Sequence, residues 1–269
     1  MQFFWLDIYN GRYSEFLSSI RNPTTKTLIF TPNPEMLLRA HSDREFLDIL
    51  GTATYNTPDA NWLYVGSLMR EGIGYLRACL ILIFSKKKLR AKYGDLIKGS
   101  DLTRDLFTYA EESVQRVLMI DNYRITTPTN PFEVEKMRIQ ADLPNLLKTR
   151  FPSLDITLVF DWEKTPEQIA ELITTSNITY VFSCIGMKIQ EQRLIEIFAY
   201  LPEDQRVVGL GVGASIDFLL WLQRRAPMIF QTLGLEWLYR LILAPQKRWR
   251  RIYAAVIEFP MMIKNTSPE

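Results

Sequence analysis

Short apolar runs alternate with amphipathic stretches along the first three quarters of the chain. The apolar runs are rich in β-branched and aromatic residues, which is typical of strands. They predict strands within residues 3–9, 26–34, 53–59, 116–121, 155–160, 178–186 and 205–213. Apolar residues at helical spacing predict helices at residues 13–20, 36–50, 102–116, 143–149, 166–174 and 190–200.

This alternation of strands and helices predicts an α/β fold. The expected architecture is a Rossmann-like, mostly parallel sheet with helices on both faces. After Gly213 the pattern changes to two or three helices with no further strand. We therefore expect a Rossmann-like domain at residues 1–220 and a helical C-terminal appendage at residues 221–269. Because every predicted strand precedes the appendage, the domain should stay folded when the residues after about Leu233 are removed.

Composition limits the kinds of partner and site. The chain has 269 residues, 47% of them hydrophobic and 23% charged, and its formal net charge is +2. These values are ordinary for a globular protein and do not indicate a nucleic-acid binder. The single histidine, His41, and the lack of a Cys/His cluster argue against a metal site. Cys79 and Cys184 lie far apart in apolar runs, which predicts buried thiols in a reducing cytoplasm and no disulfide.

No stretch of the sequence predicts a membrane-spanning helix. The longest apolar run, residues 78–84, has seven residues, whereas a spanning helix needs roughly 20. The N-terminal residues lack the basic and small-residue features of a signal peptide. Residues 83–94 hold five basic residues. They fit either an interfacial helix or, as the favoured reading, a buried helix that ends in a solvated basic tail.

Polar and small residues gather where the predicted strands end. In an open parallel sheet, ligands bind at the carboxyl ends of the strands. We therefore expect a ligand site there, and its candidate residues are Thr31, Asn33, Glu35, Asp59, Gly186, Gln190, Gly211 and Gly213.

Each of these segments also has a purely structural interpretation. Asn33 followed by Pro34 is a helix-capping pattern, although a helix N-terminus after a strand also binds anions. The Pro58–Asp59 pair is typical of a turn, which by itself is the favoured reading. The small residues from 209 to 215 fit either approach of the backbone to a diphosphate or tight packing of a helix on the sheet.

A late stretch, residues 234–252, concentrates positive charge and aromatic rings. Its basic residues are Arg240, Lys247, Arg248, Arg250 and Arg251, against one acid, Glu236. Arg251 follows Lys247 by four positions and Arg248 by three, so these side chains can share a helix face. The stretch is either a solvated basic helix packed by its aromatic rings or an anion-binding surface, and its residues alone favour the first.

Taken in order, several motifs make the chain similar to one enzyme family. They are TPNPEMLLRA, TPDA, GSDL, GMKIQE, GLGVGASIDF, RAP, GLEWLYRL and RWRR. These motifs resemble those of the WecG/TagA/CpsF family of bacterial glycosyltransferases, and they span nearly the whole chain.

The resemblance implies a reaction and its partners. Family members are inverting, metal-independent transferases with a Rossmann-like fold and a C-terminal appendage that helps to complete the site at the membrane. They move an N-acetylmannosamine-type sugar from a UDP donor to a polyprenyl-diphosphate-linked N-acetylglucosamine. A cytoplasmic protein at the inner face of the plasma membrane is therefore expected, working in cell-surface polysaccharide synthesis without a cofactor, either alone or as a homo-oligomer. On this reading the basic C-terminal helices contact the membrane.

The resemblance also assigns roles to residues. The aspartate proposed as the family's base matches Asp59. The family's threonine and asparagine after the second strand match Thr31 and Asn33, and its glutamine matches Gln190. Gly211 and Gly213 match the glycine-containing loop after the last strand, and the appendage arginines look like Arg240, Arg248 and Arg251. With this match, anion binding becomes the favoured role of the basic stretch.

The chain departs from the family pattern at several loops. Ala60 replaces the glycine after the family's Pro–Asp pair, and Ala214 and Ser215 follow Gly213 where the family has Gly-Ala. The glycine-rich loop after the middle strand is missing. These changes leave a second hypothesis open, a non-catalytic relative that binds nucleotide-sugar or lipid diphosphate as a partner subunit. A dinucleotide-dependent enzyme ranks last, because no G-x-G-x-x-G opens the first strand–helix unit.

Overall fold

The computed structural model describes residues 1–3, 6–121, 141–213 and 245–266, with seven single residues between 214 and 244. The chain divides into two compact units that are each discontinuous in sequence. The helical unit comprises residues 1–16, 31–98 and 224–269, and the sheet unit comprises residues 17–30 and 99–223. The predicted domain division near residue 220 stays a prediction.

In its described residues, the sheet unit holds five strands that pair in the order β3-β8-β7-β5-β6, all parallel. The strands are β3 (Lys26–Phe30), β5 (Arg116–Asp121), β6 (Asp155–Phe160), β7 (Tyr180–Ser183) and β8 (Val207–Gly211). The central strands are buried along almost their whole length, because helices cover both faces. The predicted α/β fold with a mostly parallel sheet is confirmed.

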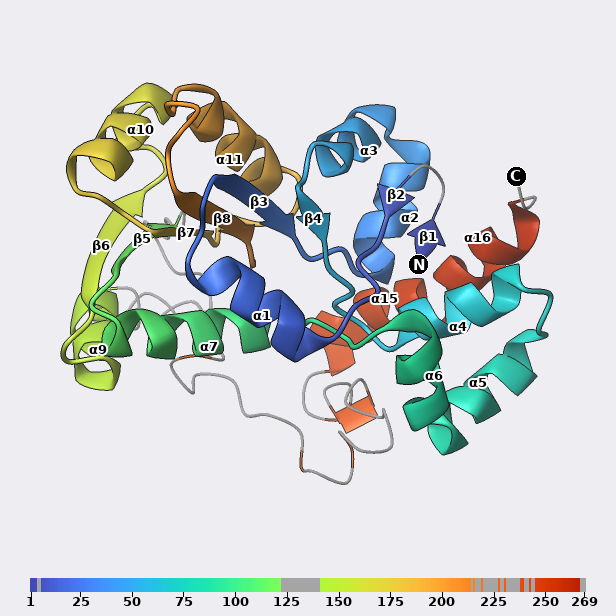
Figure 1. The fold of residues 1–269 in the computed structure, drawn as a ribbon. Helices are drawn as coiled ribbons and strands as arrows, with labels where there is room; N and C mark the ends of the chain where they lie inside the picture. Colours follow the sequence, from blue (N-terminus) through green and yellow to red (C-terminus); the bar gives the residue numbers. More distant parts are fainter. Residues whose placement is uncertain are drawn as a thin grey trace. The chain divides into compact units, whose positions relative to one another are not determined.

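Helices formed by the described residues of this unit cover the sheet. They are α7 (Gly99–Glu112), α9 (Leu143–Arg150), α10 (Pro166–Thr175) and α11 (Ile189–Ala199). Helices α10 and α11 lie over one face, and α7 and α9 lie over the other (Figure 1). The core between sheet and helices is aromatic: the Phe107 ring lies 4.8 Å from the Phe182 ring and 5.3 Å from the Phe151 ring.

The helical unit contains short strands and most of the remaining helices. Its strands are β1 (Gln2–Phe3), β2 (Leu6–Asp7) and β4 (Tyr55–Asn56), of which β1 and β2 pair antiparallel. Its helices are α2 (Pro34–Ser42), α3 (Arg44–Gly51), α4 (Trp62–Arg70), α5 (Tyr75–Phe84), α6 (Lys86–Tyr93), α15 (Pro245–Tyr253), the π-helix η1 (Ala254–Glu258) and α16 (Phe259–Asn265). Helix α1 (Tyr13–Arg21) crosses the division between the units.

The C-terminal helices belong to the core of the helical unit. Phe259 of α16 is fully buried, and its ring lies 5.7 Å from the ring of Phe3. Gly66 of α4 lets that ring approach, because a Cβ at this position would meet the Phe259 ring at 2.7 Å. A chain that ends near residue 233 lacks this packing, so the expectation that such a truncation leaves the fold intact does not extend to the helical unit.

Most predicted elements are present, and the differences have local causes. Residues 36–50 form two helices because Asp43 ends one and begins the next: its N–H donates to the Arg39 carbonyl, and its carboxylate accepts from the Phe46 N–H at 3.1 Å. The helix expected at 102–116 begins at Gly99 and ends at Glu112, and Arg116 instead begins β5.

The favoured interpretation of residues 83–94 is wrong. Residues 75–84 form α5, which exposes Leu76, Leu80 and Phe84 to solvent instead of burying them, and a separate helix, α6, carries the basic residues. Cys79 on α5 and Cys184 are free thiols as expected, but both are partly exposed and not buried. No helix in the described part of the chain has the length and apolar character to cross a bilayer.

Candidate active site

The loop after β3 forms the first part of the candidate site. Thr31 is buried, and Asn33 caps α2 by accepting a hydrogen bond from the Met36 N–H at 3.1 Å. Pro34 occupies the first turn, where its missing N–H leaves no hydrogen bond unmade. The structural reading of this segment is thus confirmed. The same geometry leaves the positive end of α2 beside Thr31 and Asn33, as an anion site requires.

The Asp59 loop is held against that first loop within the helical unit. The Asp59 N–H donates to the Pro32 carbonyl at 3.3 Å. On its other side, the Ile97 N–H donates to the Pro58 carbonyl at 2.8 Å, and the Thr57 hydroxyl donates to the Ile97 carbonyl at 3.2 Å. Asp59 itself is half-buried between β4 and α4. Its backbone is therefore fixed next to the residues that follow β3.

One appendage arginine reaches the same helix end. The Arg251 Nε of α15 lies 2.7 Å from Glu35 Oε2 in the first turn of α2. A guanidinium has further N–H groups, so this ion pair leaves donors for an additional anion. Arg240 and the side chain of Arg248 lie outside the described residues, so their predicted roles stay predictions.

In the sheet unit, Gln190 links the start of α11 to the loop after β8. Its Oε1 accepts from the Gly213 N–H at 2.9 Å, and its Nε2 donates to Glu191 Oε1 at 2.6 Å. The side chain is buried, and the two contacts fix which end of the amide carries oxygen. Gln190 therefore holds the backbone that follows β8, which is a structural role beside the ligand contact expected of it.

Gly211 and Gly213 have separate reasons to be glycine. A Cβ at Gly211 would lie 3.1 Å from Glu191 Oε1 and 3.2 Å from Gln190 Nε2, so a side chain there would press on this hydrogen-bonded pair. Gly213 has φ +53°, in the left-handed region that other residues seldom adopt. Both glycines thus shape the loop after β8. This supports the tight-packing interpretation of residues 209–215, and the predicted contact with a ligand stays a prediction.

Glu191 contacts two of the predicted site residues, Gln190 and Gly211, and is not itself among the residues predicted from the sequence. It is fully buried, and its second oxygen accepts from the Lys188 N–H at 2.7 Å. Burial raises the pKa of its carboxyl, and the hydrogen bonds from Gln190 and from backbone N–H groups oppose that rise. The GMKIQE motif ends at this residue, but the motif alone does not predict its burial, because Gly211 of β8 packs against it.

Replacing Glu191 by Gln is expected to destabilise the protein in a pH-dependent way. The amide offers one oxygen to two donors, so one buried hydrogen bond is lost, a cost of about 1–3 kcal/mol. A carboxyl whose pKa is higher in the folded protein stabilises it fully below the unfolded pKa and loses that contribution as pH rises through the folded pKa. The difference in unfolding free energy between parent and E191Q should therefore shrink as pH rises from acidic to neutral.

Urea unfolding at several pH values measures this difference. Glu196→Gln, a partly exposed change on the same helix, is the matched control and should show little effect. A pH-independent difference between parent and E191Q would mean that the pKa of Glu191 is not raised in the folded protein.

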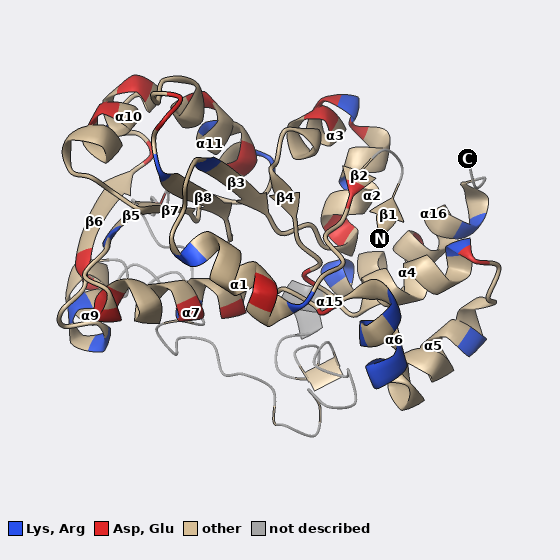
Figure 2. Ribbon diagram, viewed as in Figure 1, with Lys and Arg blue, Asp and Glu red and all other residues tan. Residues whose placement is uncertain are grey.

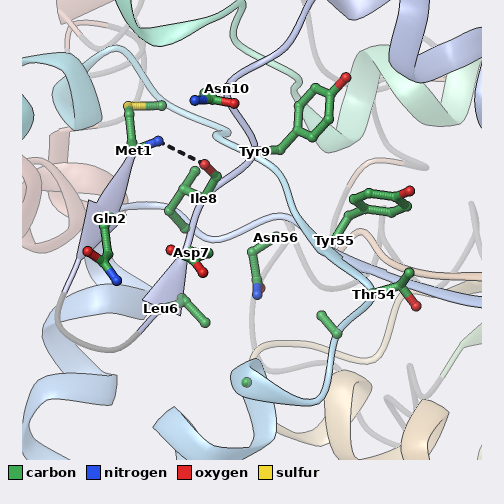
Figure 3. Close-up of a pocket in the computed structure, with 12 residues that line it drawn as sticks. Met1, Gln2, Leu6, Asp7, Ile8, Tyr9, Asn10, Thr54, Tyr55 and Asn56 are labelled. Carbon is green, nitrogen blue, oxygen red and sulfur yellow. Dashed lines mark hydrogen bonds between the residues drawn. The ribbon is translucent and has the colours of Figure 1, made fainter.

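A pocket of about 670 Å³ lies elsewhere in the helical unit (Figure 3). Residues 6–10 and 53–56, together with Met1, Gln2 and Gly51, line it. In the close-up, the Met1 amino group donates to the Ile8 carbonyl, at 2.9 Å, on one side of the cavity. None of the predicted site residues lines this pocket, so it is not the predicted site.

A metal site is not evident in the described part of the chain. Among those residues, no three His, Cys, Asp or Glu side chains are placed to hold an ion together. The metal independence expected from the resemblance stays a prediction.

Comparison with known proteins identifies the family of the chain. Residues 1–266 match the model of the glycosyl transferase WecG/TagA/CpsF family. Three similar proteins are each named N-acetylglucosaminyldiphosphoundecaprenol N-acetyl-beta-D-mannosaminyltransferase. The Bacillus subtilis protein is 25% identical over 226 residues, which cover 84% of this chain and 74% of that protein. The Bacillus spizizenii protein is 25% identical over 252 residues, covering 92% and 84%.

The third relative extends the match to another genus. The Staphylococcus aureus protein is 24% identical over 230 residues, covering 85% of this chain and 75% of its own. The family match spans almost the whole sequence and includes both compact units. The chain therefore belongs to the WecG/TagA/CpsF family of glycosyl transferases.

Proposed function

We propose that this chain transfers an N-acetylmannosamine-type sugar from a UDP donor to a polyprenyl-diphosphate-linked N-acetylglucosamine, with inversion and without a metal ion. The names of its relatives supply the acceptor and the sugar. One observation carries the proposal: the backbone of Asp59 is bonded to the loop that leads into the N-terminus of α2, where Arg251 also lies. A carboxylate and an anion-binding helix end thus occur together in one unit.

Asp59 is the proposed base. In a single displacement, its carboxylate takes the proton of the acceptor hydroxyl while that oxygen bonds to the anomeric carbon. The bond from this carbon to the UDP oxygen breaks, and its electron pair leaves with the diphosphate. A base in this position must be fixed within hydrogen-bond reach of the acceptor. The hydrogen bonds on both sides of the Pro58–Asp59 pair provide such fixation.

The leaving diphosphate gains negative charge, which positive groups must offset. The N-terminus of α2 and the Arg251 guanidinium are suited to this, because backbone N–H groups and a planar guanidinium both bind phosphate oxygens. Arg240 and Arg248 are proposed to act with Arg251.

The strand ends of the sheet unit are proposed to hold the donor. Phe30, the last residue of β3, is the register partner of Gly211, and Thr31 follows Phe30 in the chain. Gln190 orders the backbone from Gly211 to Gly213. We propose that Gln190 and the loop that it orders bind UDP. Thr31 and Asn33, at the N-terminus of α2, are proposed as further UDP-binding residues.

We expect UDP to bind equally well with and without divalent metal. Calorimetry with UDP in the presence of either EDTA or Mg²⁺ measures the dissociation constant in each case. NAD(H) in the same titration should give no heat, because the chain lacks the dinucleotide motif. Loss of UDP binding in EDTA would rule out the metal-free mechanism.

A non-catalytic relative is the second candidate function. The observation that favours it is the set of altered loop residues, Ala60 after Asp59 and Ala214 with Ser215 after Gly213. In this alternative the chain binds nucleotide-sugar or lipid diphosphate as a subunit of another enzyme. Binding of UDP with no transfer to a synthetic polyprenyl-diphosphate acceptor would favour it over the enzyme.

The C-terminal helices are proposed to contact the membrane. Trp249, Tyr253, Ile257 and Met261 recur every fourth residue through α15, η1 and α16, and all four are exposed. Arg250 and Arg251 lie beside this row and are also exposed. Aromatic and basic side chains of this kind favour the lipid headgroup region. A cytoplasmic location at the inner face of the plasma membrane, and a possible homo-oligomer, belong to the same proposal.

A further inference from the structure

Helix α5 exposes a row of apolar side chains that the proposed function does not use. Leu76, Leu80 and Phe84 are 77%, 55% and 80% exposed, and they follow one another at intervals of four residues. Residues four apart lie on the same helix face, so the three side chains form one row, the α5 stripe. Exposed apolar residues are normal when scattered singly, but a contiguous row usually marks an interaction site.

The opposite face of α5 fixes the helix to its unit. Ala78 and Leu82 are buried in a cluster with residues of α4, and the Tyr75 ring stacks on Trp62 with centroids 6.4 Å apart. The Tyr75 hydroxyl donates to the Val256 carbonyl of η1 at 2.9 Å. Because this face is already packed, turning the helix to bury the stripe would break these contacts. The stripe is therefore held in the solvent by the fold.

Helix α6 places positive charge directly after the stripe. Leu89 and Tyr93 are buried and hold the helix, whereas Lys87, Lys88 and Arg90 are exposed. Figure 2 shows the contrast, with α5 mostly tan and α6 largely blue. Between residues 73 and 94 the sequence has no Asp or Glu. The surface is thus apolar on one helix and basic on the next.

We propose that α5 and α6 together dock the protein onto an anionic phospholipid bilayer. The α5 stripe enters the boundary between headgroups and acyl chains, and the basic side chains of α6 bind lipid phosphates. An interfacial helix combines these same features, an apolar row of Leu and Phe with Lys and Arg beside it. Ten residues of helix measure about 15 Å, half of the roughly 30 Å hydrocarbon core, so α5 lies along the bilayer.

A second copy of the chain fits this surface less well. A standard protein interface buries about 800 Å² on each partner, more than three side chains on a ten-residue helix can supply. The exposed Lys87, Lys88 and Arg90 of α6 would also face the same basic residues of the other copy, because the neighbouring acid Glu71 is already paired with Lys92. An anionic lipid surface matches both the size and the charge of the patch.

Vesicle co-sedimentation of the full chain tests this docking. In one arm the vesicles are phosphatidylcholine with about 30% phosphatidylglycerol, which gives a moderately anionic surface. In the other arm they are phosphatidylcholine alone. Leu76→Ser/Leu80→Ser/Phe84→Ser should lower binding to the anionic vesicles at least tenfold. Lys87→Gln/Lys88→Gln/Arg90→Gln should lower vesicle binding by about fivefold per removed charge, and only on anionic vesicles. The remaining binding should be less sensitive to salt.

Two matched variants separate this surface from others. Val114→Ser/Tyr200→Ser removes exposed apolar side chains from the sheet unit and should bind as the parent does. Phe84→Ser alone is a milder change at a highly exposed position, and it should weaken binding even if the triple variant does not fold. Circular dichroism checks that each variant keeps its helices.

Three results would overturn the proposal. The first is parent-like vesicle binding by the folded stripe variants, and the second is no binding by the parent. The third is a parent dimer in sedimentation velocity that the stripe variant converts to a monomer, because the occupant would then be a second copy. The vesicles contain no sugar donor or acceptor, so these outcomes leave the proposed transfer reaction untouched. The inference adds a second surface to the membrane contact proposed for the C-terminal helices, and it does not depend on the proposed transfer reaction.

Discussion

Replacing Asp59 by Asn is expected to lower the rate of sugar transfer by about 10²–10⁴-fold, the usual effect of removing a general base. The amide keeps the shape of the side chain but cannot accept the proton of the acceptor hydroxyl. The affinity for UDP should not change, because the Asp59 N–H still bonds to the Pro32 carbonyl and holds the loop in place. Transfer to a synthetic polyprenyl-diphosphate acceptor and calorimetry with UDP measure the two quantities.

Asp48→Asn is the matched control, because it removes an exposed carboxylate from α3 in the same unit. It should transfer sugar at the parent rate. If D59N also does so, Asp59 is not the base and the Pro58–Asp59 pair is only a turn. If the parent binds UDP but transfers nothing, the non-catalytic alternative is favoured, whatever D59N does.

Local signals in the sequence were sufficient for much of the fold. The strand at residues 26–30 and the cap at Asn33 were both predicted, because an apolar β-branched run and an Asn–Pro pair determine their structure within a few residues. The capping box of α10 is another local device, in which Thr165 and Gln168 bond to each other's backbone N–H groups.

Other features depend on contacts that a sequence pattern does not show. Helix α5 is apolar almost all round, which predicts burial, yet the fold covers one side only and leaves Leu80 and Phe84 exposed. The role of Glu191 depends on Gly211, which comes twenty positions later in the chain. The helical unit likewise joins three distant segments, and a pattern read along the chain predicts its elements but not their assembly.

Long-range packing also determines the role of the C-terminal helices, and their local sequence pattern does not show it. Their basic and aromatic sequence predicts a C-terminal appendage that takes part in binding. The structure adds Phe259, Met262 and Ile263 of α16, which are buried in the helical unit together with Phe3 of the N-terminal segment. The proposed binding role and the stability of the helical unit therefore depend on the same segment, and a deletion cannot separate them.

Single substitutions can test the stability and the proposed binding role of these helices separately. Phe259→Ala is expected to lower the free energy of unfolding by about 3–5 kcal/mol, because a fully buried ring is lost and a cavity remains between Phe3 and Gly66. Met261→Ala on the same helix is the control; its side chain is exposed, so the change should stay within about 0.5 kcal/mol. Urea unfolding followed by circular dichroism measures both.

A small loss for Phe259→Ala would show that α16 is a separable appendage after all, and truncation near residue 233 would then be a fair test of membrane binding and catalysis. With the expected loss, those functions must be tested by exposed substitutions such as Trp249→Ala, which leave the buried face of the C-terminal helices in place.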